Sequence, residues 1–397
     1  MSKITADLKR FVGLNGALSL LTSIFVYGIG TGILAPMNAV YMSDSLGLSK
    51  GEIASIFSIT LLLNMMVTLG VGIVSDRIKR KKGLPLIASV ICLAGLIVYI
   101  QADDYAGALA GMAIAMAPSG LIMGQIFAMA RSQFSKQAES IVEIAMLWLR
   151  AGFSVGFFMG LLLGANLYLV TGFQGVLWGN VAGYAGLFLL LLFYREVAGD
   201  KEAKSSQRGE PFSLIMLIAL LMISCADAIR GLYLPLVFNE LFKRPDLFSY
   251  LWSCQAVFEL LFMTLTGYWV AKYGSKSIIF LGGACAVVAY AVYAAASPIG
   301  LFFAVQPVYS LSVSILYGVA MGYVQRMFIN YTGFGASLYI VISQAASLIG
   351  YLLPFTVKGI SPNIFFIPIV LVTAALVIIG RVLYTENKQA SMNTLNG

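Results

Sequence analysis

The chain is a succession of long apolar runs separated by short polar breaks, and this pattern limits what it can fold into. Only 11% of its 397 residues are charged, against about 25% in soluble domains. With 60% hydrophobic residues, the chain carries more apolar surface than a soluble fold can bury. Runs of this length suit helices that cross the hydrocarbon core, where the backbone must satisfy its own hydrogen bonds. We therefore predict a polytopic α-helical membrane protein.

The polar breaks divide the apolar sequence into twelve predicted spans. The first run is too long for the core of a signal peptide, so we expect it to be retained as a helix. The spans are residues 12–41, 52–75, 84–101, 106–130, 141–165, 175–194, 212–238, 248–271, 277–296, 299–325, 332–357 and 362–384.

The basic residues predict the orientation of these spans. With both termini in the cytoplasm, 19 of the 25 Lys and Arg residues fall on the inside, 4 fall in outside loops, and 2 lie within spans. This asymmetry follows the positive-inside rule. The net charge of +8 is therefore explained by topology, and we expect no nucleic-acid partner.

The two halves of the chain repeat one another. Gly32-x-x-x-Pro36 in the first predicted helix matches Gly231-x-x-x-Pro235 in the seventh, and Arg131 ending the fourth matches Arg326 ending the tenth. Repeated halves with a site between them are a transporter design. We expect two pseudo-symmetric six-helix bundles, residues 1–194 and 212–397, joined by a polar cytoplasmic linker, residues 195–211.

A basic segment after the second predicted span carries a family resemblance. Residues 72–82 resemble the major facilitator superfamily loop G-x-x-x-D-R-x-G-R-[RK], although Lys79 stands in place of its second glycine. The resemblance implies a conformational latch on the cytoplasmic side, and Asp76 could engage Arg131. The expected latch residues are Gly72, Asp76, Arg77, Arg80, Lys81 and Arg131. Anchoring by positive charge is the alternative interpretation of the basic residues.

Within the superfamily, one helix pair is similar to bacterial sugar-efflux transporters. The similarity lies in Gln125-Ile-Phe-Ala-Met-Ala-Arg131 and Leu149-Arg150-Ala151. Opine-type metallophore exporters are a related group. On the fifth predicted helix, four glycines recur every fourth residue and resemble an antiporter motif, but the proline of that motif is absent. We interpret them as a stripe of small residues for close helix packing: Gly152, Gly156, Gly160 and Gly164.

Five of the charged residues within the predicted spans stand out: Glu143, Arg150, Asp227, Arg230 and Glu259. Such residues are costly in a membrane and usually face a partner or a cavity. Three carboxylates against two guanidiniums leave one carboxylate unpaired, and in a low dielectric that group tends to hold a proton. Because the chain has no histidine, a proton relay must use Asp or Glu. We expect proton coupling at Glu259 first, then Asp227, with Glu143 nearer the cytoplasmic mouth.

Structural pairing between helices is the alternative interpretation of these charges. Asp227 and Arg230 are three residues apart and can pair along one helix. The superfamily resemblance makes helices five and eight neighbours, so an Arg150–Glu259 contact is also expected. Uncharged residues complete the predicted substrate-binding set, although packing or helix–helix hydrogen bonding is the alternative for each. That set is Arg150, Arg230, Gln125, Gln255, Gln306, Tyr27, Asn38 and Tyr233.

We predict from these features a secondary transporter that exports a small polar, charged or zwitterionic solute by proton antiport and alternating access. A sugar-like compound or an opine-type metallophore is expected, and the alternatives are a multidrug efflux pump or an importer of the same fold. The expected setting is a monomer in a bacterial inner membrane, whose partners are its small-molecule substrate, protons and the lipid bilayer. The proton gradient supplies the energy. We expect no enzyme activity, no cofactor and no metal site, because no nucleotide-binding loop, histidine or paired cysteine spacing is present.

Overall fold

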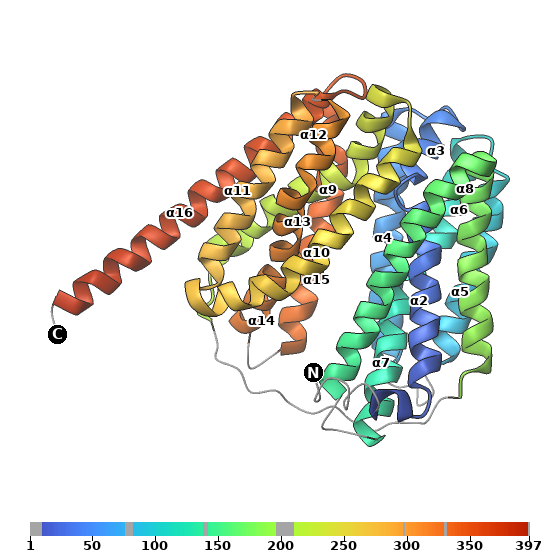
Figure 1. Cartoon of the computed structure of the whole chain (residues 1–397), viewed down its shortest axis with the longest axis horizontal. Helices are drawn as coiled ribbons and strands as arrows, with labels where there is room; N and C mark the ends of the chain where they lie inside the picture. Colours follow the sequence, from blue (N-terminus) through green and yellow to red (C-terminus); the bar gives the residue numbers. More distant parts are fainter. Residues whose placement is uncertain are drawn as a thin grey trace. The chain divides into compact units, whose positions relative to one another are not determined.

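The computed structural model describes residues 10–75, 82–137, 142–195, 210–296, 298–328 and 332–395. These residues are helical almost throughout and contain no strand, which confirms the predicted all-α class. They form two compact units (Figure 1). The first unit comprises the described parts of residues 1–204 together with Pro245–Tyr250, and the second comprises the described parts of 205–244 and 251–397.

The first unit contains seven labelled helices within the described residues. They are α2 (Ala17–Leu34), α3 (Asn38–Asp44), α4 (Lys50–Ser75), α5 (Gly83–Ile100), α6 (Tyr105–Met116), α7 (Ser119–Gln137) and α8 (Val142–Phe193).

Local sequence sets several of these helix ends. Ser49 and Glu52 form a reciprocal capping box at α4: the Ser49 amide donates to Glu52 Oε2 at 2.8 Å, and the Glu52 amide donates to Ser49 Oγ at 3.3 Å. Asp104 caps α6 by accepting from the Gly107 amide at 2.7 Å. Inside α8, Gly172 has φ 66°, so the backbone leaves helical geometry there and the element is two helices joined by a turn.

Close packing of α2 on α8 organises the first unit (Figure 1). A Cβ built on Gly156 would lie 2.2 Å from the Phe25 carbonyl oxygen, and one on Gly160 would lie 2.3 Å from that of Ile29. A Cβ on Gly32 of α2 would in turn meet the Phe157 carbonyl oxygen at 2.3 Å. The two backbones therefore touch where side chains are missing, and the interpretation of the α8 glycines as a packing stripe is confirmed.

The second unit contains the remaining labelled elements, except that the first residues of α10, Pro245–Tyr250, belong to the first unit. They are α9 (Leu214–Phe242), α10 (Pro245–Tyr273), α11 (Ser275–Ala294), α12 (Ile299–Ala304), α13 (Gln306–Ser314), the π-helix η2 (Ile315–Ala320), α14 (Met321–Met327), α15 (Thr332–Leu352), the 3₁₀ turns η4 (Leu353–Thr356) and η5 (Pro362–Phe365), and α16 (Phe366–Leu395).

The boundaries of α9 and α10 also follow from their sequence. Ser213 caps α9 by accepting from the Met216 amide at 3.4 Å. Pro245 begins α10, and Asp246 in the first turn complements the positive end of the helix dipole. Gly274, at φ 78°, ends α10 and allows α11 to begin at the next residue. These helices enclose an apolar core built from α9, α11, η2, α14, α15 and α16.

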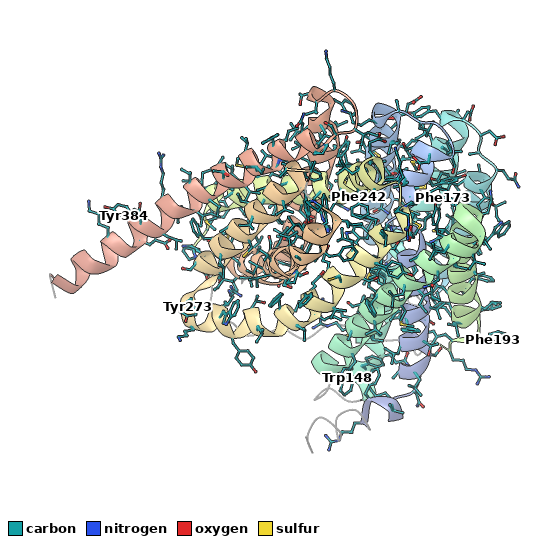
Figure 2. The ribbon with its side chains drawn as sticks, turned by 45° about the horizontal axis from the view of Figure 1, so that its top comes forward. Trp148, Phe173, Phe193, Phe242, Tyr273 and Tyr384 are labelled. Atoms are coloured by element: carbon teal, nitrogen blue, oxygen red, sulfur yellow. The ribbon has the colours of Figure 1, made fainter. Side chains whose placement is uncertain are left out.

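Apolar side chains project outward from both units. Phe193 is 80% exposed and Tyr384 is 72% exposed, and both point away from the helices that carry them (Figure 2). Many Leu, Ile and Val side chains are exposed in the same way, as expected where lipid replaces water. Within the described residues, ten helices are long and apolar enough to cross a membrane. α10 is not one of the ten, and α8 counts once despite its turn at Gly172, so the predicted number of twelve spans stays a prediction.

Candidate functional site

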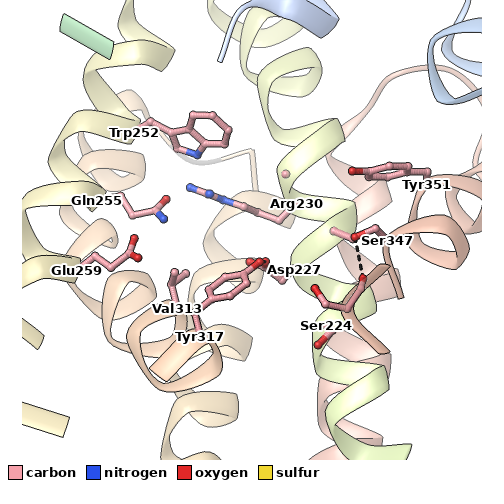
Figure 3. Close-up of a pocket in the computed structure, with 13 residues that line it drawn as sticks. Ser224, Asp227, Arg230, Trp252, Gln255, Glu259, Val313, Tyr317, Ser347 and Tyr351 are labelled. Carbon is pink, nitrogen blue, oxygen red and sulfur yellow. Dashed lines mark hydrogen bonds between the residues drawn. The ribbon is translucent and has the colours of Figure 1, made fainter. Parts of the chain in front are cut away.

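A cavity of about 310 Å³ lies inside the second unit, between α9, α10, α13, η2 and α15 (Figure 3). Two acids and one arginine are among the residues that line it. The lining residues are Ser224, Asp227, Ala228, Arg230, Gly231, Trp252, Gln255, Glu259, Val313, Tyr317, Ser343, Ser347 and Tyr351.

Helical spacing explains why these residues meet in one place. Side chains three or four residues apart lie on the same face of a helix. Trp252, Gln255 and Glu259 follow this spacing on α10. The same rule generates a polar stripe on α15, which consists of Ser343, Ser347 and Tyr351. The cavity therefore lies where these polar stripes of the second unit converge.

Two tyrosine hydroxyls hold the Asp227 carboxylate. Tyr309 of α13 donates to Oδ1, and Tyr317 of η2 donates to Oδ2 at 2.6 Å. Among the ion pairs of the described residues, none joins Asp227 to Arg230. The predicted pairing along α9 is therefore wrong as a direct ion pair, because the folded chain supplies neutral hydroxyl donors from other helices.

Arg230 is also buried, but part of its guanidinium has no hydrogen-bond partner. Its side chain is 3% exposed, and its guanidinium carbon lies 4.3 Å from the ring centre of Tyr309 and 5.7 Å from that of Trp252. Both contacts are cation–π interactions, which favour a desolvated cation. However, Nε and Nη2 have no hydrogen-bond partner. The side chain extends from α9 toward α10 and ends between Trp252 and Gln255 (Figure 3).

Glu259 and Gln255 face the cavity from α10, four residues apart (Figure 3). Two serines of α13 fix the backbone behind them: Ser310 Oγ donates to the Gln255 carbonyl oxygen at 2.9 Å, and Ser314 Oγ donates to that of Glu259 at 3.0 Å. Gln255 is 9% exposed, and its Oε1 is buried with no donor. The position of both side chains is therefore held by helix–helix hydrogen bonds.

Two other predicted substrate contacts of the second unit lie outside the lining of this cavity. Tyr233 is buried, and its hydroxyl donates to the Tyr351 carbonyl oxygen at 2.6 Å. Gln306 is fully buried, and its Nε2 donates to Tyr293 Oη at 3.0 Å and to the Phe302 carbonyl oxygen at 2.8 Å. In the structure both side chains are engaged in contacts between helices.

The predicted substrate contacts of the first unit are spread over several helices. The Tyr27 hydroxyl donates to the Ser119 carbonyl oxygen at 3.3 Å, and its ring meets Tyr184 edge-on. Asn38 is buried and accepts from the Tyr99 hydroxyl at 2.7 Å. Gln125 is buried with no donor to its Oε1. Arg150 is exposed, and its guanidinium lies 5.9 Å from the ring centre of Phe127.

The remaining predicted site residues are only partly described. Gly72 lies in α4 and Glu143 in α8, but the surroundings of both lie outside the described residues. Arg131 lies half-buried in α7. Three of the four remaining latch residues are basic, and all four fall wholly outside the described residues: Asp76, Arg77, Arg80 and Lys81.

Sequence reasoning missed part of the cavity. Tyr317 and the serines of α15 were not predicted as site residues, although the spacing of Ser343, Ser347 and Tyr351 along one face of a helix is a usable signal. No comparable signal exists for Tyr317. It lies in a π-helix, whose wider turn changes which side chains share a face, and such turns are frequent at functional sites.

Comparison with known proteins identifies the family of this chain. A model of the Major Facilitator Superfamily matches residues 20–351, which is most of the chain. The chain belongs to the major facilitator superfamily. Members of this superfamily are transporters and not enzymes, and they need no cofactor. The chain is therefore a multi-pass membrane transporter.

Two bacterial relatives within the superfamily are named for sugar efflux. A Deinococcus radiodurans protein, provisionally named a sugar efflux transporter, is 24% identical over 378 residues, covering 91% of this chain and 95% of its own. Sugar efflux transporter A of Escherichia coli is 23% identical over 292 residues, covering 71% of this chain and 73% of its own. The predicted resemblance to the sugar-efflux branch is thus confirmed.

Solved structures of the superfamily share the fold of the chain. The nucleoside transporter NupG matches with a TM-score of 0.77 at 15% identity, covering 94% of this chain and 99% of its own. The peptide transporter POT in complex with sulfate also matches with a TM-score of 0.77, at 14% identity, covering 94% of each chain. At these identities the likeness concerns the fold alone.

Proposed function

We propose that this superfamily member is a secondary active exporter that binds a small, polar, sugar-like solute in the cavity of the second unit and moves it in exchange for protons. The observation that carries the proposal is the convergence of Asp227, Arg230 and Glu259 on one cavity within an apolar, membrane-spanning bundle. Ionisable residues are expensive in that setting and usually mark a substrate or proton pathway. The names of the sugar-efflux relatives support the direction and the class of solute.

Glu259 is the proposed proton-coupling residue. A coupling acid must gain and lose a proton during the cycle. The amide of Gln255 suits both states, because its nitrogen can donate to a carboxylate while its Oε1, which has no donor, can accept from a protonated carboxyl. Asp227 suits this role less well, because Tyr309 and Tyr317 already donate to both of its oxygens. Asp227 is instead proposed to hold the cavity wall together.

The rest of the proposal concerns the whole transporter. Twelve spans follow if α10 crosses the membrane and α8 crosses it twice around Gly172. Two six-helix bundles, residues 1–194 and 212–397, would then alternate access to the solute. The linker of residues 195–211 and both ends of the chain would lie in the cytoplasm of a bacterial inner membrane. Residues 72–82 would latch the cytoplasmic side, and a monomer would suffice for the cycle.

Transport measurements on vesicles test this proposal. In inverted vesicles with an acidic interior, the wild type should accumulate labelled sugars or glycosides and release protons. Glu259→Gln should lower the rate of uphill transport at least tenfold. It should retain the exchange of labelled for unlabelled solute without a gradient, because exchange needs no proton. Asp227→Asn should weaken both. Glu240→Gln is the matched control, since Glu240 is 59% exposed and pairs with Lys243. Normal uphill transport by both cavity variants would refute proton coupling at this site.

One alternative solute class is favoured by the charges of the cavity. An arginine beside two acids also suits a zwitterion such as an opine-type metallophore. Untargeted mass spectrometry of spent medium from producing cells, with and without the protein, separates the two solutes. A missing metal-chelating zwitterion would favour metallophore export, whereas a missing sugar or glycoside would favour sugar efflux. No difference would favour drug efflux or import.

A further inference from the structure

Several buried polar atoms around the cavity of the second unit have no hydrogen-bond partner within the described residues. They include Arg230 Nε, Arg230 Nη2, Ser224 Oγ and Gln255 Oε1. The three side chains that carry them are 3%, 6% and 9% exposed, respectively. Buried polar atoms are nearly always hydrogen-bonded, so several unsatisfied atoms around one cavity indicate that a ligand supplies the partners.

The two atoms of Arg230 specify the first of these partners. Nε–H and one N–H of Nη2 point the same way from one edge of the planar guanidinium, as a two-pronged donor that matches two oxygens of one oxyanion. The rings of Tyr309 and Trp252 lie against the guanidinium at 4.3 and 5.7 Å from its carbon. These cation–π contacts provide no oxygen that could accept a hydrogen bond from the N–H groups of the guanidinium. The Nε–Nη2 edge therefore remains available for a bidentate oxyanion.

The two acids restrict the charge of that oxyanion. Asp227 and Glu259 line the same cavity as Arg230. A group with two negative charges, such as a phosphate monoester, would meet both acids with only one cation to offset them. A carboxylate carries a single charge and has the planar geometry that the guanidinium edge matches. The charge of the cavity therefore favours a monocarboxylate.

The remaining unsatisfied atoms require hydroxyl groups rather than more charge. Ser224 Oγ can donate and accept, and Gln255 Oε1 accepts only. Ser347 Oγ already donates to the Ser343 carbonyl oxygen at 2.9 Å, so it is left mainly as an acceptor (Figure 3). Hydroxyls, which both donate and accept, serve all three positions. A volume of about 310 Å³ is near the lower end of the range of about 300–1,000 Å³ for small-molecule sites, which limits the ligand to a compact molecule.

We infer that the solute is a sugar acid, a compact polyhydroxylated monocarboxylate whose carboxylate binds the Nε–Nη2 edge of Arg230 and whose hydroxyls bind Ser224 and Gln255. This inference rests on the proposed function, because it names the solute of the same cavity. It also unites two features, since the relatives are named for sugar efflux while the cavity has an unpaired guanidinium edge.

Equilibrium binding to the full-length protein in detergent or nanodiscs tests the inference, with D-gluconate, D-glucose and propionate as ligands. The wild type should bind gluconate at least tenfold more tightly than glucose, which lacks the carboxylate, and propionate, which lacks the hydroxyls. Arg230→Lys keeps the charge but loses the two-pronged edge, so gluconate affinity should fall about tenfold or more while glucose affinity stays unchanged. If the role of Arg230 were purely structural, Arg230→Lys would weaken the binding of gluconate and glucose alike.

A second variant keeps the test decisive if Arg230→Lys does not fold. Ser224→Ala should lower the affinity for gluconate several-fold and leave the affinity for propionate unchanged. Arg381→Lys, at an exposed arginine of α16, is the matched control and should leave all three affinities unchanged. Equal wild-type affinity for gluconate and glucose, or an unchanged gluconate-to-glucose ratio in Arg230→Lys, would overturn the inference.

The binding experiment can succeed or fail independently of the proposed function, because binding at equilibrium involves no proton gradient. Tight gluconate binding without proton-driven transport would support the sugar-acid inference and refute proton antiport. Glu259-dependent uphill transport of neutral sugars, without any preference for gluconate, would support proton antiport and refute the sugar-acid inference.

Discussion

The three charged residues of the cavity differ in how far the protein itself satisfies them. Asp227 has two phenolic donors, whereas Arg230 is packed against two rings with the Nε–Nη2 edge unpaired. Glu259 faces the cavity beside Gln255. Asp227, whose two oxygens both accept hydrogen bonds, is suited to architecture, and Arg230, with its unpaired edge, is suited to the solute. Glu259, beside an amide that can serve both protonation states, is suited to the proton. This difference underlies the assignment of Glu259 to coupling and Arg230 to the solute.

The architectural role of Asp227 can be measured through Tyr317. Tyr317→Phe removes the hydroxyl that donates to Oδ2 at 2.6 Å and leaves the ring in place. We expect a loss of about 0.5–2 kcal/mol in stability, because hydrogen bonds inside membranes are modest and those to charged groups are the stronger ones. Unfolding in detergent would be compared for Tyr317→Phe, Asp227→Asn and the double variant. Additive losses would contradict a direct interaction, and Tyr384→Phe, at a 72% exposed tyrosine, is the control.

At the scale of elements, the first unit depends on the contact between α2 and α8. Glycines on both helices bring the backbones so close that a Cβ at Gly32, Gly156 or Gly160 would meet a carbonyl oxygen of the other helix. Lipid supplies no hydrophobic force between helices, so such close van der Waals packing is a main source of their association. The second unit relies more on polar contacts between helices, such as those from Ser310 and Ser314 to the backbone of α10.

Alanine substitutions in the α8 stripe should be destabilising in a graded way. Gly156→Ala and Gly160→Ala place a methyl 2.2 and 2.3 Å from carbonyl oxygens of α2, and we expect a loss of about 1–3 kcal/mol for each. Gly152→Ala meets only the tip of the Leu21 side chain, which can move, so its effect should be smaller. Thermal unfolding in detergent provides the measurement.

The matched control for this series lies in α7. Gly124 has no atom within 4 Å of a built Cβ, so Gly124→Ala should leave stability unchanged or raise it by up to about 1 kcal/mol through the better helix propensity of alanine. If Gly124→Ala destabilised the protein as much as Gly156→Ala, close packing of α2 on α8 would not explain the stripe.

For the whole molecule, the distribution of charge and apolar length sets the topology. Ten helices of the described residues qualify as spans by length and composition, and the positive-inside count predicts that both ends lie in the cytoplasm. An even number of spans is required for both ends to share one side. The proposed twelve satisfy this requirement if α8 crosses twice and α10 once.

Reporter fusions test this topology directly. Green fluorescent protein fused after Gly397 should fluoresce and alkaline phosphatase fused there should be inactive, because both ends are expected inside. Alkaline phosphatase inserted at Gly172, in the turn of α8, should be active because this turn is expected outside. An active phosphatase at the C-terminus, or an inactive one at Gly172, would refute the twelve-span arrangement.

The sequence by itself determined that this protein lies in a membrane. It also determined the helical class, the family and the identity of the rare charges within the spans. These properties are carried by composition, by apolar run length and by a local motif, which need no knowledge of neighbouring helices. The glycine stripe of α8 was also readable, because its spacing of four lies along a single helix. The spacing of Asp227 and Arg230 also allows an ion pair along one helix, but the ion pairs of the described residues include none between them.

Tertiary structure alone decided which polar residues meet. Asp227 is satisfied by tyrosines from α13 and from a π-helix, at sequence separations of 82 and 90 residues, and no local pattern encodes such contacts. The same holds for Gln306 and Tyr233, whose hydrogen-bond partners belong to other helices and remove them from the cavity lining. Whether a buried polar group serves structure or solute depends on what the folded chain places within about 3 Å of it, because only a group left without a partner has reason to bind something else.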